Sequence, residues 1–212
     1  MNHWVVASIW MVMGSGLVAA GCGGGHGSSA PPNCGQQQPC GGDVVGSWSF
    51  AGECINAAAE SQELATSCPG ASIGAVGVSL TGSLAFNTDL TYTASNWHET
   101  FNVTETLPLS CVGGGSCSDL NQTTNDGITA LNITCTGTTT CVCHFSGTLT
   151  LASETSTYTI TGTNIDMAGA TTSASFSYCV EQDRLHLIDL STTMTGPAGQ
   201  AVILSDIVAQ KQ

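Results

Sequence analysis

Through most of the chain, apolar and polar residues alternate one by one within short segments. In residues 44–50, for example, Trp48 and Phe50 fall on one face, and Ser47 and Ser49 fall on the other. Alternation with this period predicts β-strands that bury one face and expose the other to water. The same pattern recurs in 79–86, 90–94, 145–151, 157–161, 175–180, 185–190 and 201–208.

The number of these segments indicates the fold class. About eight to ten strands joined by short turns predict a mostly antiparallel all-β domain, built as a barrel or a sandwich. Only two stretches, 55–66 and 116–122, have the composition of short helices. Trp97 interrupts the alternation of its segment, which predicts a rim or a bulge at this residue.

The N-terminal segment follows a different pattern, because residues 4–20 are almost wholly apolar and are followed by Gly21 and Cys22. A run of this length is marginal for a membrane span, and small residues at its end favour a processing site. The segment resembles the leader of bacterial lipoproteins, although Met1–His3 lacks a basic residue. The resemblance implies that 1–21 form a signal peptide and that Cys22 is acylated. A soluble secretory leader and a retained anchor are the alternatives.

Residues 22–43 contain mainly Gly, Ser, Pro and Gln and too few apolar residues to form a core. This composition predicts a flexible tether between the acylated residue and a folded domain over 44–212. Cys34 and Cys40 could close a small loop within this tether.

The chain contains 11 cysteines, and an acylated Cys22 would leave an even number in an exported protein. This parity predicts disulfides, with Cys54–Cys68 and a bridge from the 135/141/143 group to Cys179 as plausible pairs, although spacing alone does not determine connectivity. Cys141, Cys143 and His144 could alternatively bind a metal, but this spacing lacks a second ligand pair, so we expect none. The candidates are Cys34, Cys40, Cys54, Cys68, Cys111, Cys117, Cys135, Cys141, Cys143 and Cys179.

Charge narrows the range of partners. The chain has 2 basic and 15 acidic residues, for a net charge of −13. Nucleic-acid binding requires clustered Lys and Arg, and so does adhesion to an anionic bilayer through charge, so both are excluded.

The sequence contains no Ser/His/Asp set with recognisable triad spacing. Asp183, His186 and Asp189 lie on one strand, where side chains three apart point to opposite faces. We therefore expect no enzymatic activity and no cofactor.

Three motifs in order along the chain carry a resemblance: GSW at 46–48, FNTDLTYT at 86–93 and TYTITGTNID at 157–166. Together they resemble the lipocalin-like domains of bacterial lipoproteins, over roughly 44–208. The resemblance implies an up-and-down barrel. It also implies a basic residue packed over Trp48, but the expected last strand, 201–208, contains none. Arg184, one strand earlier, could take this place only if the sheet closes differently.

The resemblance further implies that Trp48 fills the closed end of the barrel and that aromatic residues line a site for a small apolar ligand. The function expected is that of a monomeric cell-envelope lipoprotein, attached through Cys22 to a membrane (the outer membrane) with its domain in the periplasm or at the surface. It would bind such a ligand or an envelope partner. A structural lipoprotein with a filled barrel is the alternative. The candidate ligand-binding residues are Phe86, Tyr92, Trp97, Phe145 and Tyr158.

Overall fold

The computed structural model describes residues 37–113, 115–125, 129–169, 173–195 and 201–212. The expected signal peptide, Cys22 and Cys34 lie outside these residues. Within the described part of the chain, no helix is both long enough and apolar enough to cross a membrane.

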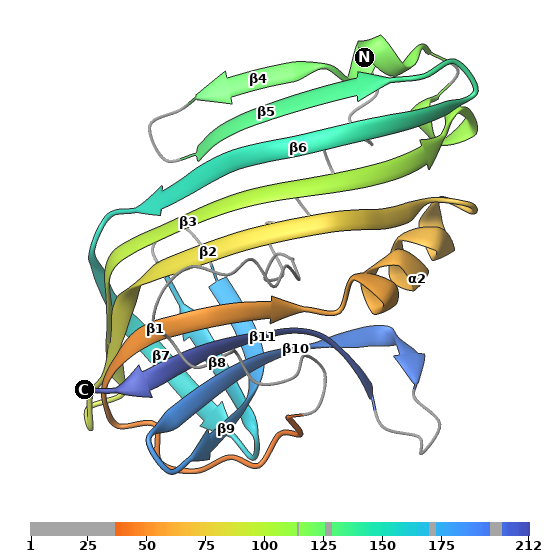
Figure 1. Ribbon diagram of the computed structural model, residues 1–212. Coiled ribbons are helices and arrows are strands. Elements are labelled where there is room, and N and C mark those ends of the chain that lie inside the picture. The colour runs from red at the N-terminus through yellow and green to blue at the C-terminus, as the bar shows by residue number, and fades with distance from the viewer. Residues whose placement is uncertain (1–36, 114, 126–128, 170–172, 196–200) are drawn as a thin grey trace.

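A closed antiparallel barrel forms the centre of the molecule (Figure 1). Its neighbours run in the order β2-β1-β11-β10-β9-β8-β7-β3, and the pairing of β3 with β2 closes the ring. The predicted all-β barrel is thus confirmed. Its strands are β1 (Gly46–Ile55), β2 (Ser72–Phe86), β3 (Thr91–Pro108), β7 (Glu154–Thr161), β8 (Asn164–Ala168), β9 (Ser173–Glu181), β10 (Arg184–Thr195) and β11 (Ala201–Lys211).

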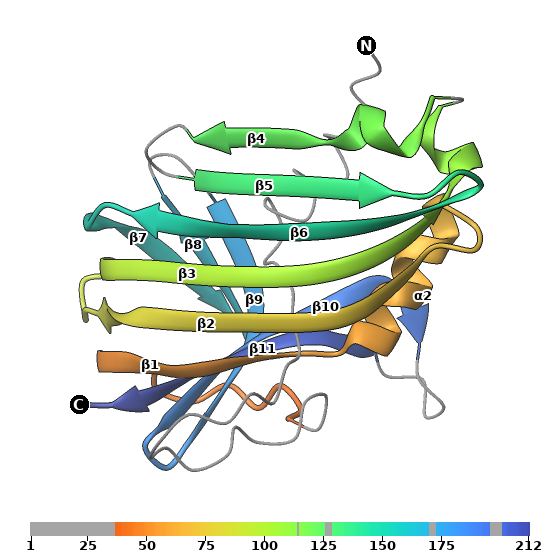
Figure 2. The ribbon, with the colours of Figure 1, turned by 45° about the horizontal axis from the view of Figure 1, so that its top comes forward.

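An insertion interrupts the simple up-and-down order. Strand β3 pairs with β7 only over Thr91–Ala94, and from Trp97 to Pro108 it pairs with β6 (Thr140–Leu151) instead. β5 (Thr129–Thr136) and β4 (Gln122–Asn125) continue outward from β6, so the sheet extends beyond the barrel. Figure 2 shows this extension as a curved sheet of β2, β3, β6, β5 and β4.

The point where β3 changes partner is a bulge opposite Gly82. The register between β2 and β3 shifts between Thr81 and Ser83, and Asn96 has a φ of 51°. Gly82 has a φ of +121°, and a Cβ there would lie 2.7 Å from the carbonyl oxygen of Asn96. Only glycine fits such a position without strain. The prediction of a bulge at Trp97 is therefore confirmed, one residue from Asn96.

The first predicted helix is present as α2 (Ala57–Ser67). The Asn56 side chain accepts a hydrogen bond from the amide of Ala59 and so caps the first turn. α2 contacts β2, β10 and β11 and lies at the end of the barrel away from the start of β1 (Figure 1). The second predicted helix is only a 3-10 turn, η2 (Cys117–Leu120), and a further turn, η1 (Leu109–Val112), precedes it.

The end of the barrel at Trp48 is closed by a packed core, which we call the base core. Trp48 is fully buried, and its indole N–H donates to the carbonyl oxygen of Val44 at 2.7 Å. Strand β11 runs three residues further than predicted, to Lys211, whose Nζ lies 5.3 Å from the centre of the Trp48 ring. The expectation that the last strand brings no basic residue to Trp48 is wrong, because the strand extends beyond the predicted end at residue 208.

A second core lies under the extension of the sheet, where α2, η1 and η2 cover its inner face. Two disulfides tie these turns down: Cys68–Cys111 joins the end of α2 to η1, and Cys117–Cys141 joins η2 to β6. Disulfides offset the small apolar content of such thin layers.

The remaining disulfides also differ from the expected pairings. Cys135 and Cys143 are opposite each other on β5 and β6 and are bonded, and Cys40 is bonded to Cys179. Cys54 is disulfide-bonded as well. The suggested pair Cys54–Cys68, the bridge from the 135/141/143 group to Cys179 and the small Cys34–Cys40 loop are all wrong. Strand register, which spacing does not reveal, decides which cysteines meet.

Candidate functional site

Three of the five candidate ligand residues belong to the base core. Phe86, Tyr92 and Tyr158 are each no more than 4% exposed. Phe86 meets Tyr158 edge-on with ring centres 5.0 Å apart, and the Tyr158 hydroxyl donates to the carbonyl oxygen of Asn87 at 2.9 Å. These side chains satisfy one another, so they fill the base of the barrel and do not line an open site.

Phe145 lies elsewhere. It is part of the second core, opposite Val103 and Ile133 on the neighbouring strands. The expectation that Phe145 lines the barrel interior is therefore wrong, because β6 pairs with β3 beyond the bulge beside Trp97 and lies outside the closed barrel.

Trp97 is the one candidate that lies at the edge of the base core. It packs edge-on against Phe50, with ring centres 4.7 Å apart. Its Nε1 is buried and has no hydrogen-bond partner within the described part of the chain. A buried N–H without an acceptor costs about 1–3 kcal/mol, so this group marks a place where an acceptor is missing.

Two carboxyl groups share the inner face with Trp97. Glu99 follows it by two residues on β3 and lies opposite Leu80 of the base core. Glu53 on β1 lies opposite Ile207, which is also in the base core. Residues opposite each other in an antiparallel pair point to the same face, so both glutamates point inward.

No described residue forms an ion pair with either inward carboxyl group, and Glu99 is only 7% exposed. One carboxylate oxygen of Glu53, Oε1, is buried and has no hydrogen-bond partner among the described residues. Burial, together with the nearby charges of Glu99 and Asp206, holds the pKa of Glu53 well above its usual value.

Three more acidic residues lie further toward the α2 end. Asp189 on β10 follows the inward-facing Leu187 by two residues, and Glu105 on β3 lies opposite Cys143 of the second core. Glu60 on α2 lies near both, because the charges of Asp189 and Glu105 contribute to its raised pKa. Together with the two inward glutamates these residues form what we call the acidic mouth: Glu53, Glu60, Glu99, Glu105 and Asp189.

Burial dominates the electrostatics of the acidic mouth. Desolvation raises the pKa of Glu99 and of Glu105 to about 7. The pKa of Glu60 is also about 7, first through burial and then through Asp189, Glu63 and Glu105. Burial, with a smaller effect of Glu63, raises the pKa of Asp189 to about 6. Several strongly perturbed carboxyl groups facing one interior are typical of functional sites.

No basic side chain compensates these carboxyl groups. Arg184 and Lys211 are the only Lys or Arg residues in the chain. Arg184 is exposed on β10, and Lys211 lies over Trp48 at the opposite end of the barrel. The charged side chains of the interior at the α2 end are therefore all acidic.

The acidic mouth does not form a compact metal site. In a cation site, three or more ligand atoms lie within about 5 Å of one another, because each lies about 2.3–2.6 Å from the ion. Among the described residues, only Cys40, Cys179 and Glu181 meet such a criterion, and the two cysteines are bonded to each other. The carboxyl groups are thus spread over a wider area than one metal ion spans.

The inward carboxyl groups were missed in the sequence because acidic residues on alternating strands are expected on the wet face. One signal was present: Glu99 shares the face of Trp97 by spacing, and Asp189 shares the face of Leu187. Reading each strand face for its acidic members, as well as its apolar ones, would have found both residues.

The histidines of the described residues lie outside the barrel interior. His186 and Asp206 form a buried pair on the outer face of β10 and β11, with Nδ1 2.9 Å from Oδ2. Asp189 points inward from the same strand. His186 and Asp189 therefore lie on different faces, as their spacing predicts. His144 contacts Thr104 at 3.1 Å, and its neighbours Cys141 and Cys143 are bonded elsewhere, which overturns the metal alternative.

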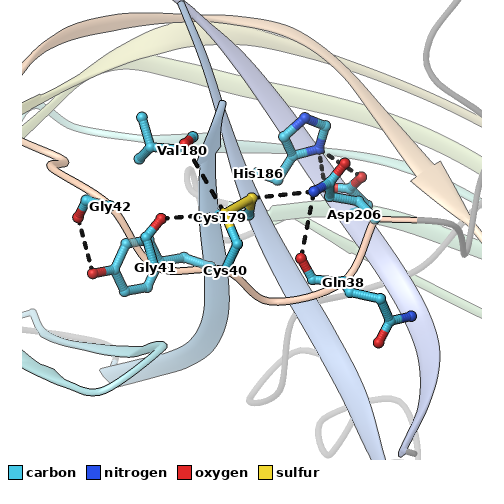
Figure 3. Close-up of a disulfide and its surroundings, with 10 residues drawn as sticks. Gln38, Cys40, Gly41, Gly42, Cys179, Val180, His186 and Asp206 are labelled. Atoms are coloured by element: carbon cyan, nitrogen blue, oxygen red, sulfur yellow. Dashed lines mark hydrogen bonds and ion pairs between the residues drawn. A yellow bond between two sulfur atoms is a disulfide. The ribbon is translucent and has the colours of Figure 1, made fainter. Parts of the chain in front are cut away.

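A strap formed by residues 37–43 crosses this outer face (Figure 3). The amides of Cys40 and Gly41 donate to the carbonyl oxygen of Tyr178, and Cys40 is bonded to Cys179. The Gln37 side chain donates to Sγ of Cys179 at 3.1 Å. The expected tether, drawn to residue 43, is therefore too long, because its last residues are fixed to β9.

A separate hollow of about 410 Å³ lies among β7, β8 and β9, where Tyr158, Met167 and Ala174 form part of its lining. Its lining shares no residue with the acidic mouth.

Comparisons with protein-family models, with curated proteins and with solved structures gave no match to this chain. The barrel fits the architecture implied by the resemblance to lipocalin-like domains, and membership in a family of lipoproteins stays a proposal.

Proposed function

We propose that the chain is an exported, lipid-anchored cell-envelope protein that binds a small ligand at the α2 end of its barrel. The observation that carries the binding proposal is Trp97, whose buried indole N–H has no acceptor among the described residues, together with the buried Oε1 of Glu53, which has no partner there either. Two polar groups left without partners on one interior face cost stability unless a ligand or water satisfies them.

Export is supported by the disulfides, since such bonds persist in oxidising compartments. The anchor is supported only by the sequence at Ala20-Gly21-Cys22, which lies outside the described residues. Location at the outer membrane, a monomeric state and the lack of enzymatic activity stay predictions.

The alternative function is a structural lipoprotein that binds no small ligand. The base core favours it, because Trp48, Leu84 and Phe86 fill the barrel base and are no more than 1% exposed. The two functions differ at the α2 end, where a binding protein must accept a ligand beside Trp97.

Two measurements test the proposal. Replacing Cys22 with Ser should move the protein from the membrane fraction to the soluble fraction and abolish incorporation of a fatty-acid probe, while Cys34→Ser should leave both unchanged. For binding, amphipathic probes with an eight-carbon chain should change the tryptophan emission with saturation, and Trp97→Phe should remove that response. A Cys22→Ser protein that still incorporates the probe would contradict the anchor, and unchanged emission with every probe would favour the structural alternative.

A further inference from the structure

The polarity of the proposed binding site indicates the kind of ligand. From the base core outward, the interior changes from packed apolar side chains to Phe50 and Trp97 and then to the carboxyl groups of Glu53 and Glu99. A ligand that fits this change in polarity needs an apolar part that contacts the aromatic rings and a polar head that contacts the carboxyl groups.

Charge then decides the head group. All five residues of the acidic mouth are acidic, and the chain's only two basic residues lie elsewhere. A carboxylate or phosphate head would be repelled by carboxylates on at least three elements: β1, β3 and β10. An ammonium head would instead neutralise them and form charge-assisted hydrogen bonds.

The spread of the carboxyl groups separates an organic cation from a metal ion. No three of these groups have oxygen atoms within 4.8 Å of one another. An ammonium group needs only one or two carboxylates at hydrogen-bond distance, and its apolar body reaches the aromatic rings nearby. Trp97 and Phe50 also present ring surfaces that attract cations.

We propose that the acidic mouth binds a small amphipathic amine, with its ammonium group between Glu53 and Glu99 and its apolar body against Phe50 and Trp97. This inference rests on the proposed binding function and specifies the ligand class. It does not follow from the number of acidic residues alone, because the buried Oε1 of Glu53 has no hydrogen-bond partner among the described residues and would accept a hydrogen bond from an ammonium group.

Proton binding should compete with the amine. Glu53, Glu99, Glu105, Asp189, Glu60 and Glu63 are the acidic groups on the elements around the mouth, and Asp206 acts on Glu53 from β11. Burial raises the pKa of Glu99 to about 7, so Glu99 is largely protonated in mildly acidic solution and ionised in mildly basic solution. Amine binding should therefore strengthen as the pH rises from about 5 to about 8, where the ammonium head stays charged.

The test uses three probes with the same eight-carbon chain: octylammonium, octanol and octanoate. Each is titrated into the full-length purified protein at about pH 8 and followed by calorimetry and by tryptophan emission. Octylammonium should bind at least about ten-fold more tightly than octanol, and octanoate should bind more weakly still. Glu99→Gln and Glu53→Gln should each weaken octylammonium binding about ten-fold or more and leave octanol binding unchanged.

A matched control removes the same charge away from the mouth. Glu181 is exposed on β9, and Glu181→Gln should leave the affinity for all three probes unchanged. Circular dichroism checks that each variant is folded, and Glu105→Gln provides a second variant at the mouth if Glu99→Gln does not fold.

The outcomes separate the two proposals. If octanol or octanoate binds as tightly as octylammonium, the amine inference fails and binding of a small apolar ligand stands. If Glu181→Gln weakens octylammonium binding as much as Glu99→Gln, the attraction is only to the overall negative charge and the inference also fails. If no probe binds, both proposals fail and the structural alternative is supported.

Discussion

The ammonium group of Lys211, the penultimate residue, lies 5.3 Å from the centre of the Trp48 ring, which is near the start of the first strand. Trp48 and Lys211 are opposite each other in the antiparallel pairing of β1 and β11, so the two ends of the domain meet at this contact. Gln212 extends the pairing, because its amide donates to the carbonyl oxygen of Ser47 at 2.9 Å. The end of the chain thus covers the closed end of the barrel.

Replacing Lys211 with Met should destabilise the domain by about 0.5–1 kcal/mol, because a cation over an indole ring contributes about that amount at a partly exposed site. The free energy of unfolding in urea, followed by tryptophan emission, measures the change. Arg184→Met is the control, because Arg184 is exposed and its replacement removes an equal charge. Equal losses in both variants would show that net charge, and not the contact with Trp48, is responsible.

Replacing Gly82 with Ala should lower the stability by more than 1 kcal/mol. A residue at φ +121° is strained, and its Cβ would lie 2.7 Å from a backbone oxygen that cannot easily move. Gly77 on the same strand is the control, because a Cβ there meets no atom within 4 Å. Thermal unfolding of both variants checks the prediction, which fails if Gly77→Ala is as destabilising as Gly82→Ala.

Stability should fall as the pH rises from about 5 to about 8. The folded protein holds protons on Glu60, Glu99 and Glu105 up to a pKa of about 7, whereas these groups ionise near their ordinary value of 4.5 when unfolded. The folded state therefore binds more protons over this range, and its stabilisation is lost as the pH passes through the raised pKa. The Tm should decrease by several degrees, since about 1 kcal/mol shifts the Tm of such a domain by roughly 2–4 °C.

The Glu99→Gln variant tests the origin of this pH dependence. Glutamine does not titrate, so the decrease in Tm between mildly acidic and mildly basic solution should become smaller. The matched variant Glu181→Gln, on the exposed surface, should keep the full decrease. A Tm that is higher at about pH 8 than at about pH 5 in the unchanged protein would contradict the raised pKa values.

The disulfide connectivity can be read directly by mass spectrometry. With only 2 basic residues in the chain, trypsin cuts too rarely, so cleavage at acidic residues and by pepsin is needed. Under non-reducing conditions, peptides joined through Cys40–Cys179, Cys68–Cys111, Cys117–Cys141 and Cys135–Cys143 should be found. A peptide joined through Cys54–Cys68 would contradict the structure, because Cys68 is bonded to Cys111.

The sequence by itself determined the all-β class, the first helix and the presence of disulfides, whereas its strand pattern left a barrel and a sandwich open. The strands and the helix follow from local patterns: side chains on a strand alternate with a period of two, and an alanine-rich segment favours a helix. The disulfides follow from the number of cysteines. Trp97 could likewise be placed at a bulge, because an interrupted alternation is visible in the chain itself.

Only the tertiary structure decided where the long strands change partners, which cysteines meet and which carboxyl groups point inward. Strand β3 continues past Asn96 with a new neighbour, and no local pattern reveals which strand that neighbour is. For the same reason Phe145 could not be placed in the second core, nor Lys211 over Trp48. Glu53 and Glu99 come together through strand register, a property of the folded sheet that links residues far apart in the sequence.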